Sequence, residues 1–194
     1  GSLEERTKGS PQGSVISPLL SNLFMHYAFD EWLRRNFPHI QFARYADDAV
    51  IHARSLSEAK QVLEAVRLRL LECDLELHPE KTKIVYCQDS DRRGSHDHIQ
   101  FDFLGYTFRP RRAKNRWGKL FVSFLPAVSN KAANSIRATI RSWRLGATRN
   151  NQSLEAIAKF VNPYVRGWVN YYGRFYKSAL TPVLRGLERS LVYW

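Results

Sequence analysis

The chain has 194 residues, 44% hydrophobic and 25% charged, which is ordinary globular usage and excludes a disordered or fibrous chain. Its formal charge of +12 favours a polyanionic partner, most often nucleic acid. Only two cysteines occur, and no apolar run approaches the ~18 residues that cross a bilayer, so we expect no disulfide framework, no membrane span and a reducing, cytoplasmic location.

Local signals in the first 108 residues predict alternating helices and short strands. Pro18 suits the first turn of a helix, and Ser55 with Glu58 has the spacing of a capping box. The predicted elements are a loop over residues 1–13, a helix over 17–36, strands over 41–45 and 49–54, a helix from 55 to about 73, a strand over 83–87, a loop over 89–98 and a strand over 100–108.

Beyond Arg109 the pattern becomes mainly helical. After one more strand over residues 120–124, helical spacing predicts helices over residues 130–145, 154–161, 163–177 and 181–194. The sequence therefore predicts an α+β fold, in which a mixed unit is followed by a basic helical bundle.

The positive charge lies almost wholly in this second part. Residues 1–108 contain 13 basic and 16 acidic side chains, whereas residues 109–194 contain 17 and 2, together with 13 of the 25 aromatic residues. A basic surface with interleaved aromatic side chains can hold phosphates and stack on bases. The alternative is that the aromatic residues form a core and the arginines only solvate it. We expect most aromatic residues to be core and the basic part to bind nucleic acid.

One predicted helix separates these two roles. Arg137, Arg141 and Arg144 follow i, i+4, i+7 spacing, so they share one face of a regular helix. Ile136, Ile140 and Trp143 share the adjacent face. We expect the apolar stripe to face the bundle and the arginine stripe to face RNA.

The sharpest local feature is an acidic pair in a turn. Tyr45-Ala46-Asp47-Asp48 places two adjacent carboxylates between two apolar strands. Adjacent carboxylates repel each other unless a cation binds, and Mg²⁺ prefers carboxylate oxygens together with substrate phosphates. An isolated Asp-Asp pair is also common in ordinary turns. The neighbouring sequence is therefore needed to distinguish a metal site from a simple turn.

Those neighbours form an ordered series of blocks. In chain order they are Gly9-Ser10-Pro11-Gln12-Gly13, Ser17-Pro18-Leu19-Leu20-Ser21-Asn22, Tyr45-Ala46-Asp47-Asp48, Leu77-His78-Pro79-Glu80-Lys81-Thr82 and Phe103-Leu104-Gly105-Tyr106. The series resembles the later motifs of reverse transcriptases, in particular the reverse transcriptase/maturases encoded by group II introns. The segment from Asn162 to Tyr172 is similar to the maturase domain, often called domain X.

This resemblance implies a fold and a division of the chain. Residues 1–108 would be a partial polymerase palm, an antiparallel sheet with helices. Residues 109–194 would be a connecting strand and an all-helical basic thumb/maturase bundle. The parent protein would copy RNA into DNA with two Mg²⁺ ions, a DNA primer and dNTPs, and would bind group II intron RNA in splicing.

The resemblance also implies roles for single residues. Asp47 would be a metal ligand of the palm, and Asp48 would assist it. Tyr45 would pack near the primer end and Ala46 under the bound base pair. The remaining implied contacts are with the incoming nucleotide and template for Pro11, Gln12 and Gly13, with the leaving pyrophosphate for Lys81, with the primer for Leu104, Gly105 and Tyr106, and with RNA for Arg166.

Several of these roles have simpler alternatives. Lys81 can equally pair with Glu80 or be a solvated loop residue. Gly105 can equally be a glycine bulge in a core strand. Trp168 and Tyr172 lie one helical turn apart, so we expect at least one of them to be core.

The family's polymerase needs a third carboxylate on an earlier palm strand, which would lie upstream of Gly1. We therefore expect that this chain alone does not extend a primer, and that it self-associates through the sheet edge left unpaired beside the Asp47 hairpin. One alternative is a non-enzymatic RNA-binding splicing factor with a vestigial palm. Another is a reverse transcriptase of another bacterial lineage such as a retron, and the maturase-like segment argues against it.

Overall fold

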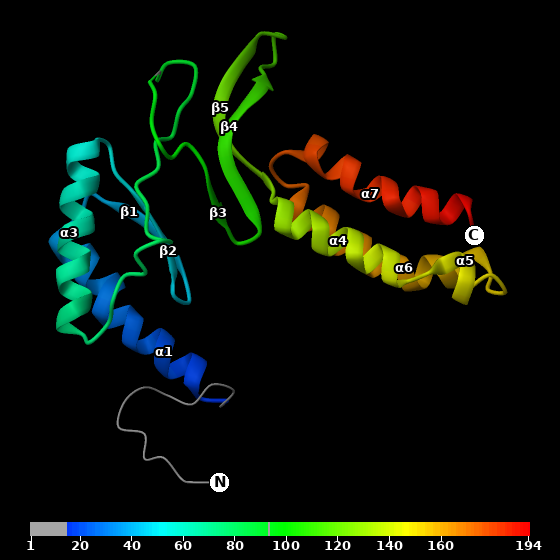
Figure 1. Ribbon diagram of the computed structural model, residues 1–194, viewed down its shortest axis with the longest axis horizontal. Coiled ribbons are helices and arrows are strands. Elements are labelled where there is room, and N and C mark those ends of the chain that lie inside the picture. Colours follow the sequence, from blue (N-terminus) through cyan, green and yellow to red (C-terminus); the bar gives the residue numbers. More distant parts are fainter. Residues whose placement is uncertain (1–14, 93) are drawn as a thin grey trace. The chain divides into compact units, whose positions relative to one another are not determined.

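The computed structural model of the chain describes residues 15–92 and 94–194 (Figure 1). They divide into two compact units between Ile84 and Val85, and each unit is described by itself. The architecture is α+β, as predicted, with helices beside small antiparallel sheets. Of the helices in the described part of the chain, none has the length and apolar character that a bilayer crossing requires.

The first unit packs helices against a two-stranded sheet. Its elements are α1 (Ser17–Met25), the π-helical segment η1 (His26–Glu31), α2 (Trp32–Asn36), β1 (Gln41–Tyr45), β2 (Asp48–His52) and α3 (Leu56–Glu72). Strands β1 and β2 are antiparallel, with Tyr45 opposite Asp48. The core consists of six buried residues, five from the helical segments and one, Ile40, just before β1: Phe29, Leu33, Ile40, Val62, Val66 and Leu70.

The predicted capping box of α3 forms in part. The Ser55 hydroxyl accepts a hydrogen bond from the Glu58 backbone N–H at 3.1 Å, as expected. The Glu58 carboxylate accepts from the backbone N–H of Arg54, one residue before the position that the box requires. The apolar stripe of the predicted helix is confirmed, since Val62, Val66 and Leu70 are buried.

The second unit joins a three-stranded sheet to a helical bundle. Its elements are β3 (Phe101–Phe103), β4 (Tyr106–Lys114), β5 (Leu120–Val128), α4 (Asn130–Ser142), α5 (Leu145–Thr148), α6 (Leu154–Tyr172) and α7 (Lys177–Val192). The sheet order is β3-β4-β5, with both pairs antiparallel. The bundle core contains Ile136, Ile140 and Trp143 from α4 and its end, as predicted, packed with Ile157, Val161, Leu180 and Val183.

Two strand predictions were wrong. Residues 83–87 form no strand, because the described chain offers them only isolated backbone bonds, such as Tyr86 N–H to His98 C=O at 2.8 Å, rather than a continuous ladder. Residues 100–108 are not one strand but two, β3 and β4. Leu104 and Gly105, with φ of 50° and 78°, reverse the chain between them as a type I′ turn does.

Two helix predictions were also wrong. Helix α6 runs unbroken through Pro163, although a proline cannot donate the backbone hydrogen bond to residue i−4. Both Pro163 and Lys159 are exposed, so water can hydrate the freed carbonyl of Lys159. Helix α4 ends at Ser142, three residues earlier than predicted, because Arg144 adopts a left-handed φ of 45°.

Candidate functional site

The acidic pair lies at the exposed end of the β1–β2 hairpin. Because Tyr45 pairs with Asp48, only Ala46 and Asp47 form the turn, and Asp48 is already the first residue of β2. Ala46 has a φ of 53°, and Asp47 is not in the left-handed region, which are the φ signs of a type II′ hairpin turn. Tyr45, Ala46, Asp47 and Asp48 are all exposed to solvent.

Within the part of the chain that the structure describes, no ion pair neutralises Asp47 or Asp48. No group of three acidic, histidine or cysteine side chains that could hold a metal gathers among those residues. Among the described residues, the donor set is therefore two adjacent carboxylates outside any ion pair. Such a set fits a hard divalent cation that takes its remaining ligands from water and substrate phosphate.

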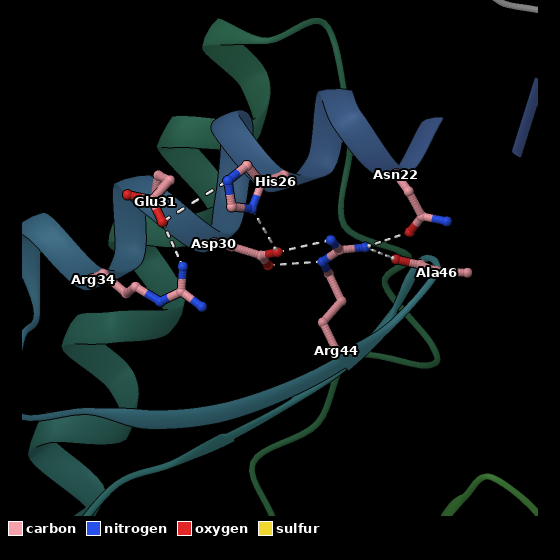
Figure 2. Close-up of polar contacts among 7 residues, drawn as sticks. All are labelled: Asn22, His26, Asp30, Glu31, Arg34, Arg44 and Ala46. Carbon is pink, nitrogen blue, oxygen red and sulfur yellow. Dashed lines mark hydrogen bonds and ion pairs between the residues drawn. The ribbon is translucent and has the colours of Figure 1, made fainter. Parts of the chain in front are cut away.

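Arg44 stabilises the turn by hydrogen bonding to its backbone (Figure 2). The Arg44 guanidinium donates two hydrogen bonds to the Asp30 carboxylate, from Nε to Oδ1 at 2.7 Å and from Nη2 to Oδ2 at 2.8 Å. Its Nη1 donates to the backbone carbonyl of Ala46 at 2.7 Å and to Oδ1 of Asn22 at 3.1 Å. The Arg44 side chain thus links Ala46, the residue before Asp47, to Asn22 in α1 and Asp30 in η1.

This ion pair is well shielded from water. The side chains of Arg44 and Asp30 are 10% and 12% exposed. The hydrogen bonds from Arg44 lower the pKa of Asp30 below its usual value, and the same contact raises the pKa of Arg44. His26 lies on the other side of Asp30, with Nδ1 3.6 Å from Oδ2. Asp30 therefore stays ionised and holds Arg44 in one orientation.

The sequence analysis missed this network, although the sequence carries a signal for it. In β1 the side chains alternate between exposed and half-buried, and Arg44 follows two residues after Phe42, which packs on the core. A charged residue at an inward position of a strand needs a partner. The partner is Asp30, which the π-helical turns of His26–Glu31 place toward the sheet. A π-helical segment has no sequence signature of its own, and such segments are frequent at functional sites.

The other predicted palm residues are distributed as follows. Lys81 is exposed in a turn closed by the Thr82 N–H and the His78 carbonyl at 3.0 Å. Among the described residues no hydrogen bond or ion pair joins Lys81 to Glu80, Asp47 or Asp48. Pro11, Gln12 and Gly13 lie outside the described residues.

Of the predicted primer-contacting residues, Leu104 and Gly105 form the β3–β4 turn, and Tyr106 is the first residue of β4. Leu104 is 39% exposed, whereas Tyr106 is buried and donates its hydroxyl hydrogen to the Tyr171 carbonyl. In return the Tyr171 hydroxyl donates to the Leu104 carbonyl at 2.9 Å. A Cβ on Gly105 would lie 2.9 Å from the Tyr172 hydroxyl. The end of α6, in the maturase-like segment, therefore packs against this turn and hydrogen-bonds to it.

The arginine stripe does not form as predicted. Arg137 and Arg141 lie on α4, but Arg144 lies beyond its end, so the three do not share one helical face. Arg137 is half-buried and donates to Asn134 Oδ1 at 3.0 Å, while Arg141 and Arg144 are exposed. Arg166 is exposed on α6.

The aromatic residues of α6 are mainly structural, as expected. Trp168 stacks on Trp143 with ring centroids 5.7 Å apart, and Phe160 packs on Trp143 edge-on at 5.6 Å. Tyr172 is half-buried against the same core. Tyr164 and Tyr171 are 47% and 46% exposed, so two rings of this helix remain partly open to solvent.

Comparison with known proteins agrees with these features. Residues 3–108 match the model of the family described as reverse transcriptase (RNA-dependent DNA polymerase), and residues 133–194 match the group II intron, maturase-specific domain. Protein YkfC of Escherichia coli (strain K12) is 29% identical over 183 residues, covering 75% of this chain and 43% of that protein.

A second group of relatives is viral and shares a shorter segment. Protein P of woolly monkey hepatitis B virus (isolate Louisville) is 38% identical over 73 residues, which cover 38% of this chain and 9% of the viral protein. Protein P of hepatitis B virus genotype D (isolate Germany/1-91/1991) gives the same identity and coverage. The chain thus spans less than half the length of each of these relatives. The two domain matches establish that the chain belongs to the reverse transcriptase (RNA-dependent DNA polymerase) family and carries a group II intron maturase-specific domain.

Proposed function

We propose that this chain is part of an RNA-directed DNA polymerase that also binds group II intron RNA and supports its splicing and mobility. The observation that carries the proposal is the exposed end of the β1–β2 hairpin within the reverse transcriptase match. There the Asp47 and Asp48 carboxylates form no ion pair with the described residues, and Arg44 holds the neighbouring Ala46 carbonyl. The strongly basic region that follows contains the maturase match. The proposed partners are RNA as template and intron, a DNA primer and dNTPs. The proposed boundary between palm and thumb/maturase parts lies at residues 108 and 109.

Asp47 and Asp48 are the residues proposed to hold Mg²⁺. Bound there in the complete enzyme, two such ions would stabilise the attacking and leaving oxygens of an in-line phosphoryl displacement. The chain's own contribution is to present the two carboxylates at the end of the β1–β2 hairpin, where Arg44 holds the Ala46 carbonyl. Lys81 is the proposed donor of positive charge to the leaving pyrophosphate, and Pro11, Gln12 and Gly13 are proposed to face the incoming nucleotide.

The contacts to nucleic acid are proposed to come from both units. Tyr45 and Ala46 are proposed to lie against the primer end and the bound base pair, and Leu104 and Gly105 against the primer backbone. Tyr106 supports that turn from the interior. Arg137, Arg141, Arg144 and Arg166 are proposed to bind RNA.

Intron binding is tested with the purified chain and a transcribed group II intron RNA in Mg²⁺. We expect tighter binding than to an unrelated structured RNA of equal length at 150 mM salt. Equal affinity for the two RNAs would contradict the maturase part of the proposal.

Polymerase chemistry is tested by primer extension on an RNA template. We expect no robust extension by this chain alone, since among the described residues no third metal-ligating side chain gathers with Asp47 and Asp48. Mg²⁺-dependent extension that Asp47→Asn abolishes would show that the two carboxylates suffice.

A further inference from the structure

The hairpin formed by β4 and β5 carries a concentrated positive charge. Six basic residues lie between positions 109 and 119, and no Asp or Glu occurs from residue 103 to residue 154. None of these six cations takes part in an ion pair with any residue of the described chain. The basic residues of the hairpin are Arg109, Arg111, Arg112, Lys114, Arg116 and Lys119.

The tip of the hairpin is a turn held by several hydrogen bonds. The side-chain Oδ1 of Asn115 accepts hydrogen bonds from the backbone N–H groups of Trp117, at 3.0 Å, and Lys119, at 2.9 Å. The Asn115 N–H donates to the Lys119 carbonyl at 3.0 Å, and Gly118 supplies the positive φ of 85° that the turn requires. The turn lies at the opposite end of the hairpin from α4 (Figure 1).

This turn presents an aromatic ring to solvent. Trp117 is 75% exposed, and the Arg116 guanidinium lies 4.0 Å from its ring centroid. Leu120, beside the turn, is 66% exposed. A large aromatic ring held in water by a fixed turn contributes little to the fold, but it offers a stacking surface for a base.

The middle of the hairpin is fixed by Tyr176, just before α7 in the same unit. The Arg111 guanidinium lies 5.4 Å from the Tyr176 ring centroid, and its Nε donates to the Leu125 carbonyl at 3.2 Å. The Tyr176 hydroxyl donates to the Arg112 carbonyl at 3.1 Å. The positive charges therefore stand on a strand that is anchored before any ligand binds.

The geometry suits an extended polyanion. Alternate residues of a strand share one face and lie about 7 Å apart, so Arg112 and Lys114 form one row of charge at the end of β4, and Trp117 follows in the turn. Such a row can follow the backbone of a single strand while the ring at its end stacks on a base. An anionic lipid surface also attracts lysine, arginine and tryptophan, but the reverse transcriptase and maturase matches on either side of the hairpin favour RNA.

We propose that the β4–β5 hairpin is a binding surface for single-stranded RNA, with phosphates held by Arg112, Lys114 and Lys119 and one base stacked on Trp117. This inference rests on the proposed function, because it takes RNA as the partner of the chain. It identifies a surface in residues 109–132, between the two family matches, that neither match covers.

The test uses the full chain and a labelled 20-nucleotide single-stranded RNA of mixed sequence, with affinity measured at several salt concentrations. The charge variant is Arg112→Gln/Lys114→Gln/Lys119→Gln, which leaves the anchored Arg111 in place. The matched control removes three exposed charges from the first unit, as Arg35→Gln/Arg54→Gln/Lys60→Gln. Circular dichroism confirms that each variant is folded.

We expect the charge variant to lose about 10- to 100-fold in affinity at 100 mM salt and to flatten the log–log salt slope by about 2, at roughly 0.7 per phosphate contact. The control variant should change the slope far less. Trp117→Leu should weaken binding at least about fivefold and Trp117→Phe much less, because stacking needs an aromatic ring.

The outcomes separate the two proposals. If the unmodified chain binds no RNA, the proposed function itself fails. If it binds RNA and the hairpin variant binds with the same affinity and slope, the hairpin inference is overturned while the proposed function stands. Equal losses in the hairpin and control variants, or retention of the chain on phosphatidylserine vesicles that RNA cannot displace, would also overturn it.

Discussion

Arg44→Ala should destabilise the first unit and loosen the acidic turn. The substitution leaves Asp30 ionised with its side chain only 12% exposed, and it removes the donor to the Ala46 carbonyl. Removing one partner of a buried ion pair costs about 3–5 kcal/mol, and we expect about 3 because both groups keep a tenth of their surface in water. For a unit of this size, that corresponds to a melting temperature lower by about 10–20 °C.

Thermal and urea denaturation followed by circular dichroism measure this effect. The matched control is Arg67→Ala, which breaks an exposed arginine–carboxylate pair with Glu64 and should leave the melting temperature close to that of the unmodified chain. The double variant Asp30→Leu/Arg44→Leu should recover most of the loss, since no unpaired charge remains buried.

Two results would refute this reasoning. One is an Arg44→Ala chain that unfolds at the same temperature as the Arg67→Ala control. The other is an Asp30→Leu/Arg44→Leu chain whose destabilisation equals the sum of those of Asp30→Leu and Arg44→Leu, because that would mean that Arg44 and Asp30 are not coupled.

Four further predictions follow from the same structure. The pKa of Asp30 is lowered in the folded state, so the stability that its ionised carboxylate contributes is complete above the ordinary pKa of 3.8 and is lost as the pH falls through the lower folded pKa. In Asp30→Asn, the melting temperature measured against pH should therefore fall less steeply in that window. Gly105→Ala should destabilise by about 1–3 kcal/mol in urea unfolding because of its φ of 78° and the Tyr172 hydroxyl 2.9 Å from a Cβ, whereas Gly167→Ala, in open space on α6, should not; equal effects would contradict this. Arg137→Gln/Arg141→Gln/Arg144→Gln should weaken binding to structured intron RNA and reduce its salt slope, and unchanged binding by a folded variant would mean that these arginines are only solvated. The chain should self-associate through an open edge of the β1–β2 sheet, and light scattering that gives a monomer at high concentration would count against it.

Much of the fold was predictable because local signals and tertiary packing agree. Strand β1 was predicted to the residue, and α3 begins after the Ser55 cap. The buried face of α4 was predicted through Ile136 and Ile140. In these elements the hydrophobic period alone identifies the face that packs, so no distant contact is needed.

Where predictions failed, the surroundings of a segment in the folded chain decided its local conformation. Leu104 takes a positive φ that its own sequence disfavours, in a turn held by Tyr171 and capped by the Ser129 N–H on the Gly105 carbonyl. Pro163 stays helical because the Lys159 carbonyl, which it leaves without a backbone donor, lies on an exposed face where water can hydrate it. No local pattern carries this information.

The candidate site was predictable in its chemistry but not in its support. Asp47 and Asp48 stand out as adjacent residues in a predicted turn. The brace from Arg44 to Asp30 joins residues 14 positions apart through a π-helical segment, and helical periodicity does not predict that geometry.

Binding of a divalent cation at the acidic turn tests the account most directly. Mn²⁺ titrated into isotope-labelled chain broadens the NMR signals of nuclei near the bound ion. We predict that the amide signals of Ala46, Asp47, Asp48 and Ala49 broaden first, and that Asp47→Asn removes this selectivity in a folded chain. Broadening that begins elsewhere, for example at Asp89 and Asp91, and is unchanged in Asp47→Asn would contradict the assignment of this turn as the metal-binding part of a polymerase.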